Sequence, residues 1–131
     1  MTGKLIYLAA PYTHADRAIM VDRFNRINAV AAKIMARGEY VFSPISHTHP
    51  IADAGTLPRG WEYWKGYDTV MVSRCTKLYV LMLEGWTVSV GVNAEIDLAD
   101  KLNIPIVYID EKLNETMDVV EAMRRFESRK T

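Results

Sequence analysis

Two short apolar runs, each followed by a turn and a helical pattern, constrain the fold of this chain more than any other feature. The first run, 5–10, stops at Pro11, and the second, 78–83, leads through a short connector to the turn 89–95. A continuous apolar run that ends at a breaker is typical of a strand buried on both faces of a parallel sheet. We therefore expect these two runs to be the central strands of such a sheet.

Helical patterns alternate with the strands. Apolar residues recur at intervals of three and four from Met20 to Ile34, and Gly38 is a typical helix end. The expected helices cover residues 15–37, 61–74, 89–102 and a last segment from 114 or 116 to about 128. Two further strands are expected at 39–42 and 104–109. The segment 45–60 is expected to be a long irregular loop, and such loops are usually functional or mobile.

This alternation predicts an α/β fold in a single domain that covers residues 1–131. We expect a flavodoxin-like (Rossmann-like), doubly wound parallel sheet with strand order 2-1-3-4, to which a fifth element could be added. In such sheets the ligand lies at the carboxyl ends of the strands, where the order reverses. The loop that begins at Pro11 and Tyr12 should therefore lie beside the turn at Ser89.

Composition excludes several classes of function. Lys plus Arg and Asp plus Glu are 16 each, so the chain lacks the basic excess of a nucleic-acid or acidic-membrane binder. The single cysteine, Cys75, permits no internal disulfide and suits a reducing cytoplasm. No signal-peptide pattern and no apolar run of membrane-spanning length is present. We expect a cytoplasmic protein that binds a small molecule.

The turn 89–95 carries the strongest chemical signal. Ser89 is a good N-cap, and Gly91 would let backbone amides approach an anion at the positive end of the helix. Glu95 follows between one and two helical turns later, where its carboxylate could face the same pocket. The alternative reading is an ordinary helix start with a solvated Glu, because short motifs of this kind often occur by chance.

The segment 45–60 and the helix after it hold further candidates. His47 and His49 with Asp53 have a metal-like spacing, but no third ligand is fixed, so a contact of His47 with a base or a phosphate is favoured over a metal. Aromatic residues between Trp61 and Tyr67 could stack on a nucleobase or could pack in a core or a dimer. Arg17 could reach a phosphate or be a solvated charge.

Three pieces of the sequence resemble the nucleoside 2-deoxyribosyltransferase superfamily: residues 5–10 with Tyr7, Asp68 before the second apolar run, and Ser89-x-Gly91-x-x-x-Glu95. The last motif is most similar to the deoxynucleoside 5′-monophosphate N-glycosidase branch. In transferases that act on unphosphorylated nucleosides, the position of Ser89 is usually an Asp that contacts the sugar. Residues 9–14 and 42–47 also resemble a small bacterial and phage branch.

The resemblance implies cleavage or transfer of an N-glycosidic bond in a nucleotide or deoxynucleoside, without cofactor or metal. Glu95 would attack the anomeric carbon, as the carboxylate of a retaining glycosidase does. Tyr7 would hold that carboxylate, and Asp68 would assist departure of the base. Ser89 and the Gly91 amides would hold a 5′-phosphate, with Pro11, Tyr12 and His47 as further substrate contacts.

Two alternatives remain open at this point. The first is a phosphoribohydrolase acting on modified purine monophosphates, although the chain lacks the Pro-Gly-Gly run of that group. The second is a nucleotide-sensing module without turnover. A homodimer or higher homo-oligomer is also expected, with the aromatic helix 61–67 as the interface, because related enzymes complete their pocket with residues of a neighbour.

Overall fold

Five strands form one sheet in the computed structural model, which describes residues 3–130 and, within α5, side chains as far as residue 125. The strands are β1 (Ile6–Ala9), β2 (Val41–Phe42), β3 (Lys77–Leu81), β4 (Ile106–Ile109) and β5 (Glu115–Thr116). Their order is β2-β1-β3-β4-β5; the first four are parallel, and β5 runs antiparallel to β4. The predicted α/β flavodoxin-like order is confirmed, with the fifth strand at the edge of the sheet.

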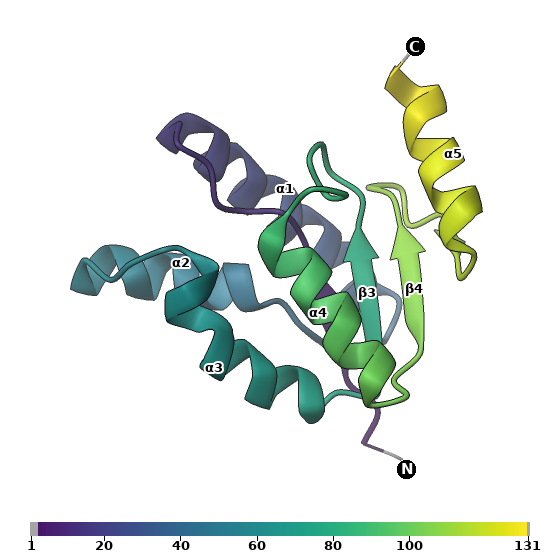
Figure 1. Ribbon diagram of the computed structural model, residues 1–131, viewed down its shortest axis with the longest axis horizontal. Coiled ribbons are helices and arrows are strands. Elements are labelled where there is room, and N and C mark those ends of the chain that lie inside the picture. Colours follow the sequence, from purple (N-terminus) through teal and green to yellow (C-terminus); the bar gives the residue numbers. More distant parts are fainter. Residues whose placement is uncertain (1–2, 131) are drawn as a thin grey trace.

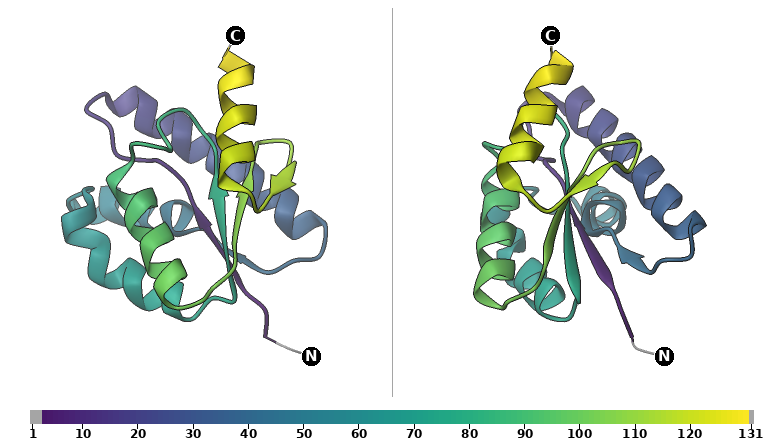
Figure 2. Two further views of the ribbon diagram at one scale, coloured as in Figure 1. Left: turned by 45° about the vertical axis from the view of Figure 1, so that its right-hand side comes forward. Right: turned by 90° about the vertical axis from the view of Figure 1, so that its right-hand side faces the viewer.

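Helices cover both faces of this sheet (Figures 1 and 2). They are α1 (Arg17–Ala36), α2 (Pro44–Gly55), α3 (Trp61–Ser73), α4 (Val90–Lys101) and α5 (Val119–Lys130). Helices α1 and α2 lie on one face, and α3 and α4 lie on the other, as the right-hand view of Figure 2 shows. Within residues 3–130, none of the helices combines the length and the apolar character needed to span a membrane.

The central strands are buried on both faces because successive side chains point to opposite sides. Ile6 and Leu8 of β1 belong to the core beneath α1, whereas Tyr7 and Ala9 belong to the core beneath α3 and α4. All residues of β1 are buried. This two-sided burial explains why the run 5–10 is apolar throughout instead of alternating.

The start of α1 differs from the expected helix start. The N-cap is Asp16, whose Oδ1 accepts from the Ala18 amide at 2.9 Å. Thr13, which precedes the helix, takes no part in this cap and donates from its hydroxyl to the Arg59 carbonyl. Thr13 therefore ties two loops together, and Asp16 alone caps the helix. At the other end Arg37 is the C-cap, and Gly38 follows with a φ of +91°.

The prediction of an irregular loop at 45–60 is wrong over most of that segment, because residues 44–55 form α2. Pro44 lies in the first turn, where its fixed φ suits a helix and its missing N–H has no helical partner to lose. Pro50 lies inside the helix and disfavours it. Tertiary packing compensates: His49 and Ala52 are buried, and the His49 ring stacks on Phe24 of α1 at 4.2 Å between centroids.

Smaller differences concern element ends. The strands are shorter than expected, because pairing begins only at Val41 in β2 and at Ile106 in β4. The cap of α5 is Asp118, whose Oδ1 accepts from Val120 at 2.9 Å, and not Asn114 or Thr116. The arrangement of the strands is unaffected, so the carboxyl ends of β1 and β3 lie side by side at the centre of the sheet.

Candidate functional site

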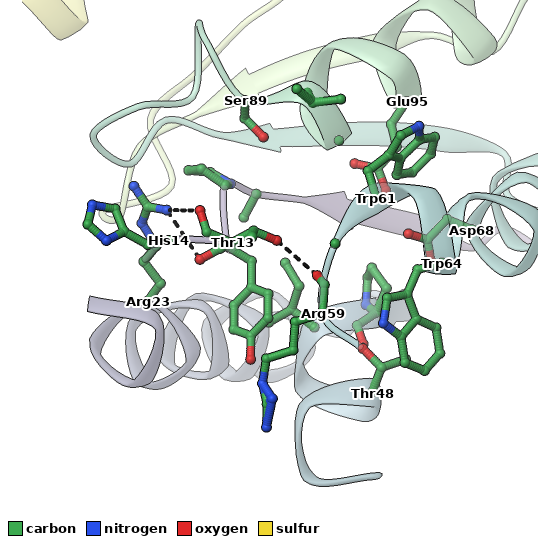
Figure 3. A pocket seen from close by; sticks show the side chains of 18 of the residues that line it. Thr13, His14, Arg23, Thr48, Arg59, Trp61, Trp64, Asp68, Ser89 and Glu95 are labelled. Carbon is green, nitrogen blue, oxygen red and sulfur yellow. Dashed lines mark hydrogen bonds between the residues drawn. The ribbon is translucent and has the colours of Figure 1, made fainter. Parts of the chain in front are cut away.

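A cavity of about 590 Å³ opens at the carboxyl ends of β1 and β3 (Figure 3). The loop after β1 and the turn before α4 both line it, as the strand order predicts. The remaining walls come from α1, α2, α3, α4 and the segment between α2 and α3. Of the predicted site residues, Pro11, Tyr12, Asp68, Ser89, Gly91 and Glu95 line the cavity.

Tyr7 and Glu95 form a buried hydrogen-bonded pair at the inner end of this cavity. The Tyr7 hydroxyl donates to Oε2 of Glu95 at 2.5 Å. Tyr7 is fully buried and Glu95 is 5% exposed, although Glu95 still reaches the cavity wall. Tyr7 does not line the cavity and contacts Glu95 from behind. The structure thus brings together two residues that are 88 positions apart.

Burial has a strong effect on the acidity of Glu95. It raises the pKa of this carboxyl to about 8; the hydrogen bond from Tyr7 opposes the rise, and the charge of Asp68 adds to it. Burial also raises the pKa of Asp68 to about 6, and the Tyr7 hydroxyl opposes that rise. With these pKa values Glu95 is protonated and Asp68 is ionised at neutral pH, and two carboxyl groups in different protonation states can work as an acid and a base.

Asp68 reaches the cavity from α3, on the same side as Glu95 and Trp61 (Figure 3). Trp61, at the start of α3, packs beside the first turn of α4: a Cβ at Gly91 would lie 3.6 Å from its Cε3 atom. That distance is an ordinary van der Waals contact, so packing against Trp61 does not by itself require a glycine at this position. The predicted approach of its amide to an anion is a separate expectation.

Ser89 caps α4, as expected. Its hydroxyl oxygen accepts from the Val92 amide at 3.2 Å. Accepting that bond leaves the hydroxyl proton free to be donated to a ligand, and the amides at the start of the helix present a partial positive charge. The carboxylates on the cavity wall, by contrast, all come from α3 and α4: Glu62, Asp68 and Glu95.

The opposite wall is basic. His14 and Arg23 line it on one side, and His49 and Arg59 line it on another. Figure 3 shows Arg23 and His14 at the end of the cavity away from Asp68. A ligand that is anionic at one end and reactive at the other would match this distribution of charge.

Arg23 joins the two loops that form the cavity mouth. Its Nη1 donates to the carbonyls of Tyr12 and Thr13, and its Nη2 donates to the carbonyl of Glu84 at 3.0 Å. Sequence reasoning missed this residue. The available signal was its place between Met20 and Ile27 on the buried face of α1, where a charged side chain is unusual without a partner.

The two histidines of α2 differ in position. His47 does not line the cavity; its ring lies 6.1 Å from that of Phe42, between centroids. His49 lines it instead, and its Nδ1 is hydrogen-bonded to the Tyr12 hydroxyl. Burial lowers the pKa of His49, and the charges of Arg17 and Arg59 lower it further. Because α2 is a helix and not a loop, residues two apart face different directions, which the sequence reading did not anticipate.

Groups of three or more His, Cys, Asp or Glu side chains that could hold a metal ion are absent from the part of the chain that the structure describes. His49 and Asp53 do come close, with Nε2 to Oδ2 at 3.4 Å. Asp53, however, also binds the side chains of Arg17 and Arg59. Its carboxylate is therefore committed to guanidinium groups.

Comparison with known proteins gives a family but not an activity. No curated protein matches the chain. One family model, a domain of unknown function (DUF1937), matches residues 4–111, which include β1 to β4 and every residue of the cavity wall. The chain therefore belongs to the DUF1937 family.

Proposed function

We propose that the protein cleaves or transfers the N-glycosidic bond of a nucleotide or deoxynucleoside through a covalent intermediate on Glu95. The observation that carries the proposal is the Tyr7–Glu95 hydrogen bond at the inner end of the cavity, with Asp68 close enough to affect the pKa of Glu95. The resemblance to the nucleoside 2-deoxyribosyltransferase superfamily supports it, because the same residues carry that resemblance.

In the first step, a carboxylate oxygen of Glu95 forms a bond to the anomeric carbon of the sugar. The bond from that carbon to the base nitrogen breaks, and its electron pair stays with the base. A protonated Asp68 then gives its proton to the base, so that a neutral base departs. Tyr7 keeps the carboxylate of Glu95 oriented during the attack.

In the second step, water, or a second base in a transfer reaction, attacks the anomeric carbon and releases Glu95. Asp68 accepts the proton of the attacking group and returns to its starting state. Without a ligand, the raised pKa values place a proton on Glu95 and not on Asp68 at neutral pH, so this proton must move to Asp68 before Glu95 attacks. Positive charge that develops on the sugar ring favours the ionised form of the neighbouring Glu95, which opposes the effect of burial.

The basic wall of the cavity favours a substrate that carries a 5′-phosphate. Ser89 can donate its hydroxyl proton to a phosphate oxygen while it caps α4, and the first amides of the helix face the same region. Trp61 and Trp64 line the acidic side, where a departing base would stack.

A base-release assay tests the proposal. Wild-type protein is incubated with a panel of nucleosides and their 5′-monophosphates, and free base is quantified by chromatography. We expect release from at least one 5′-monophosphate, and a covalent sugar adduct on Glu95 by mass spectrometry. A correctly folded protein that releases no base from any member of the panel would contradict the proposal.

The assay also separates the alternatives. A phosphoribohydrolase would act only on ribonucleoside monophosphates with modified purines. A nucleotide-sensing module would bind nucleotides without turnover, and its binding would be unchanged in Glu95→Gln. Glu95 is buried and hydrogen-bonded to Tyr7 instead of being solvated. A buried carboxyl group with a raised pKa is more typical of an active site than of a binding module, which favours an enzyme.

The expected homo-oligomer is likewise a proposal. Helix α3 leaves Tyr63, Tyr67 and Val70 exposed along one side, at 50%, 37% and 53%. These residues recur at helical spacing and could pack against a second copy of the chain. Light scattering at micromolar concentration tests the assembly, and a strictly monomeric mass would reject it.

A further inference from the structure

Two guanidinium groups share the carboxylate of Asp53 beside the cavity. Nη2 of Arg17 donates to both oxygens of Asp53, at 2.8 and 2.9 Å. Nη2 of Arg59 donates to Oδ1, the same oxygen that accepts the shorter of these two bonds. One carboxylate thus faces two positive charges, and the group keeps a net positive charge.

The two arginines are not equivalent. Arg59 lines the cavity, whereas Arg17 does not. Arg17 already binds Asp53 through both oxygens, which satisfies the carboxylate without Arg59. The Nε atom of Arg59 is buried and has no hydrogen-bond partner among the described residues. A buried donor without an acceptor is unfavourable, so the side chain of Arg59 is incompletely satisfied where it lies.

The backbone at Arg59 is better anchored than its side chain. The Arg59 carbonyl accepts from the Thr13 hydroxyl at 2.9 Å, and the preceding Pro58 carbonyl accepts from the indole N–H of Trp64 at 2.8 Å. The side chain can therefore turn while the main chain stays in place. Arg59 lines the cavity, and Figure 3 shows its side chain away from Asp68 and Glu95.

We propose that Arg59 is an anion-binding arm, held by Asp53 in the ligand-free protein and transferred to a phosphate group of the ligand. Arg17 remains on Asp53 and keeps that carboxylate paired. The inference rests on the proposed function for its ligand, a nucleoside 5′-monophosphate, but not on any catalytic step. Asp53 and the phosphate compete for Arg59, so Asp53 sets how strongly the arm is available.

Binding experiments test this competition. All proteins carry Glu95→Gln, so that no bound nucleotide can turn over and a failure of the catalytic proposal does not affect the result. The probes are inorganic phosphate, 2′-deoxyadenosine 5′-monophosphate and unphosphorylated 2′-deoxyadenosine. Affinity is measured by titration calorimetry, and folding is checked by thermal unfolding.

Arg59→Gln is expected to weaken binding of both phosphate-bearing probes about 10-fold or more and to leave 2′-deoxyadenosine unaffected, because a hydrogen bond to a charged group is lost. Arg17→Gln is the comparison variant: it removes the other positive charge from Asp53 but no cavity residue. Asp53 then has Arg59 as its remaining arginine partner, so phosphate affinity should fall, but by less than in Arg59→Gln. Asp53→Asn should bind phosphate more tightly, and adding Arg59→Gln should abolish that gain.

Three results would overturn the proposal. The first is unchanged phosphate affinity in a folded Arg59→Gln protein. The second is an equal loss of affinity in Arg59→Gln and Arg17→Gln, which would mean that the pair acts only through net charge. The third is the absence of binding of either phosphate probe to the parent protein.

Discussion

The hydroxyl of Tyr7 and the carboxylate of Glu95 meet at 2.5 Å at the point where β1 and the first turns of α4 approach each other. Neither side chain could be satisfied alone in this position. Tyr7 is fully buried, and burial raises its pKa well above the ordinary value, with the charge of Glu95 as the next cause. The hydroxyl therefore stays protonated and acts as a permanent donor to Glu95.

Replacing Glu95 should separate catalysis from binding. Glu95→Ala is expected to reduce turnover by a factor on the order of 10⁴ while substrate affinity changes little, because the bond to the anomeric carbon strengthens only toward the transition state. Single-turnover kinetics and calorimetric binding measure the two effects. Full activity in Glu95→Ala would exclude the covalent mechanism.

Tyr7→Phe should move the pH dependence of activity upward. The hydrogen bond from Tyr7 opposes the rise in the pKa of Glu95, so its removal raises that pKa further above about 8. Fewer molecules then hold an ionised Glu95 at neutral pH, and kcat/KM at pH 7 should fall about 10-fold or more. A profile of kcat/KM against pH that keeps its wild-type limbs in Tyr7→Phe would contradict this coupling.

The raised pKa of Glu95 also predicts a dependence of stability on pH. Its ordinary value is 4.5 and its folded value is about 8, so the folded state binds more protons between these limits. Stability from this group is fully present below about pH 4.5 and is lost as the pH rises through about 8. Urea denaturation at pH 5 and pH 8 should show a smaller loss in Glu95→Gln than in wild type. An equal loss in both proteins would show that Glu95 is not the group responsible.

The two roles of Ser89, as helix cap and as phosphate contact, can be separated with two substitutions, of which only one keeps a capping oxygen. Ser89→Ala removes the cap of α4 and should cost about 1 kcal/mol of stability, in addition to weaker binding of 5′-monophosphates. Ser89→Asp keeps a capping oxygen for the Val92 amide and should retain stability, but its negative charge should repel a phosphate. Unphosphorylated nucleosides should bind Ser89→Ala like wild type. If monophosphates and nucleosides lose affinity equally, Ser89 is only a helix cap.

Alanine substitutions at Gly85 and Gly38 form a matched pair that tests the role of Arg23. Both have a φ of +91°, so an alanine at either position is strained by about 1–3 kcal/mol. A Cβ at Gly38 would meet nothing within 4 Å, whereas a Cβ at Gly85 would lie 3.1 Å from Nη2 of Arg23. Gly85→Ala should therefore destabilise more than Gly38→Ala in urea denaturation. It should also weaken substrate binding, because Arg23 holds the two loops at the cavity mouth. Equal destabilisation in the two variants would mean that Arg23 adjusts freely.

The sequence by itself determined the sheet and the inner end of the cavity. The apolar runs 5–10 and 78–83 have no polar face, so only a strand covered on both sides can bury them. Once these two strands are adjacent, the residues near their carboxyl ends and in the next helix must share one crevice. Tyr7 and Glu95 could therefore be placed together, and the Ser89 cap followed from local hydrogen bonding alone.

The tertiary structure decided the basic wall. Residues 44–55 contain an internal proline, which disfavours a helix, and they become a helix because His49 and Ala52 are buried against the rest of the fold. That helix turns His49 into the cavity and His47 out of it. The pairing of Arg17 with Asp53 likewise joins residues 36 positions apart in the chain, and Arg59 reaches the same carboxylate from the loop after α2. Local propensity and residue spacing do not predict such contacts, because the contacts form only when α1, α2 and the loop before α3 pack together.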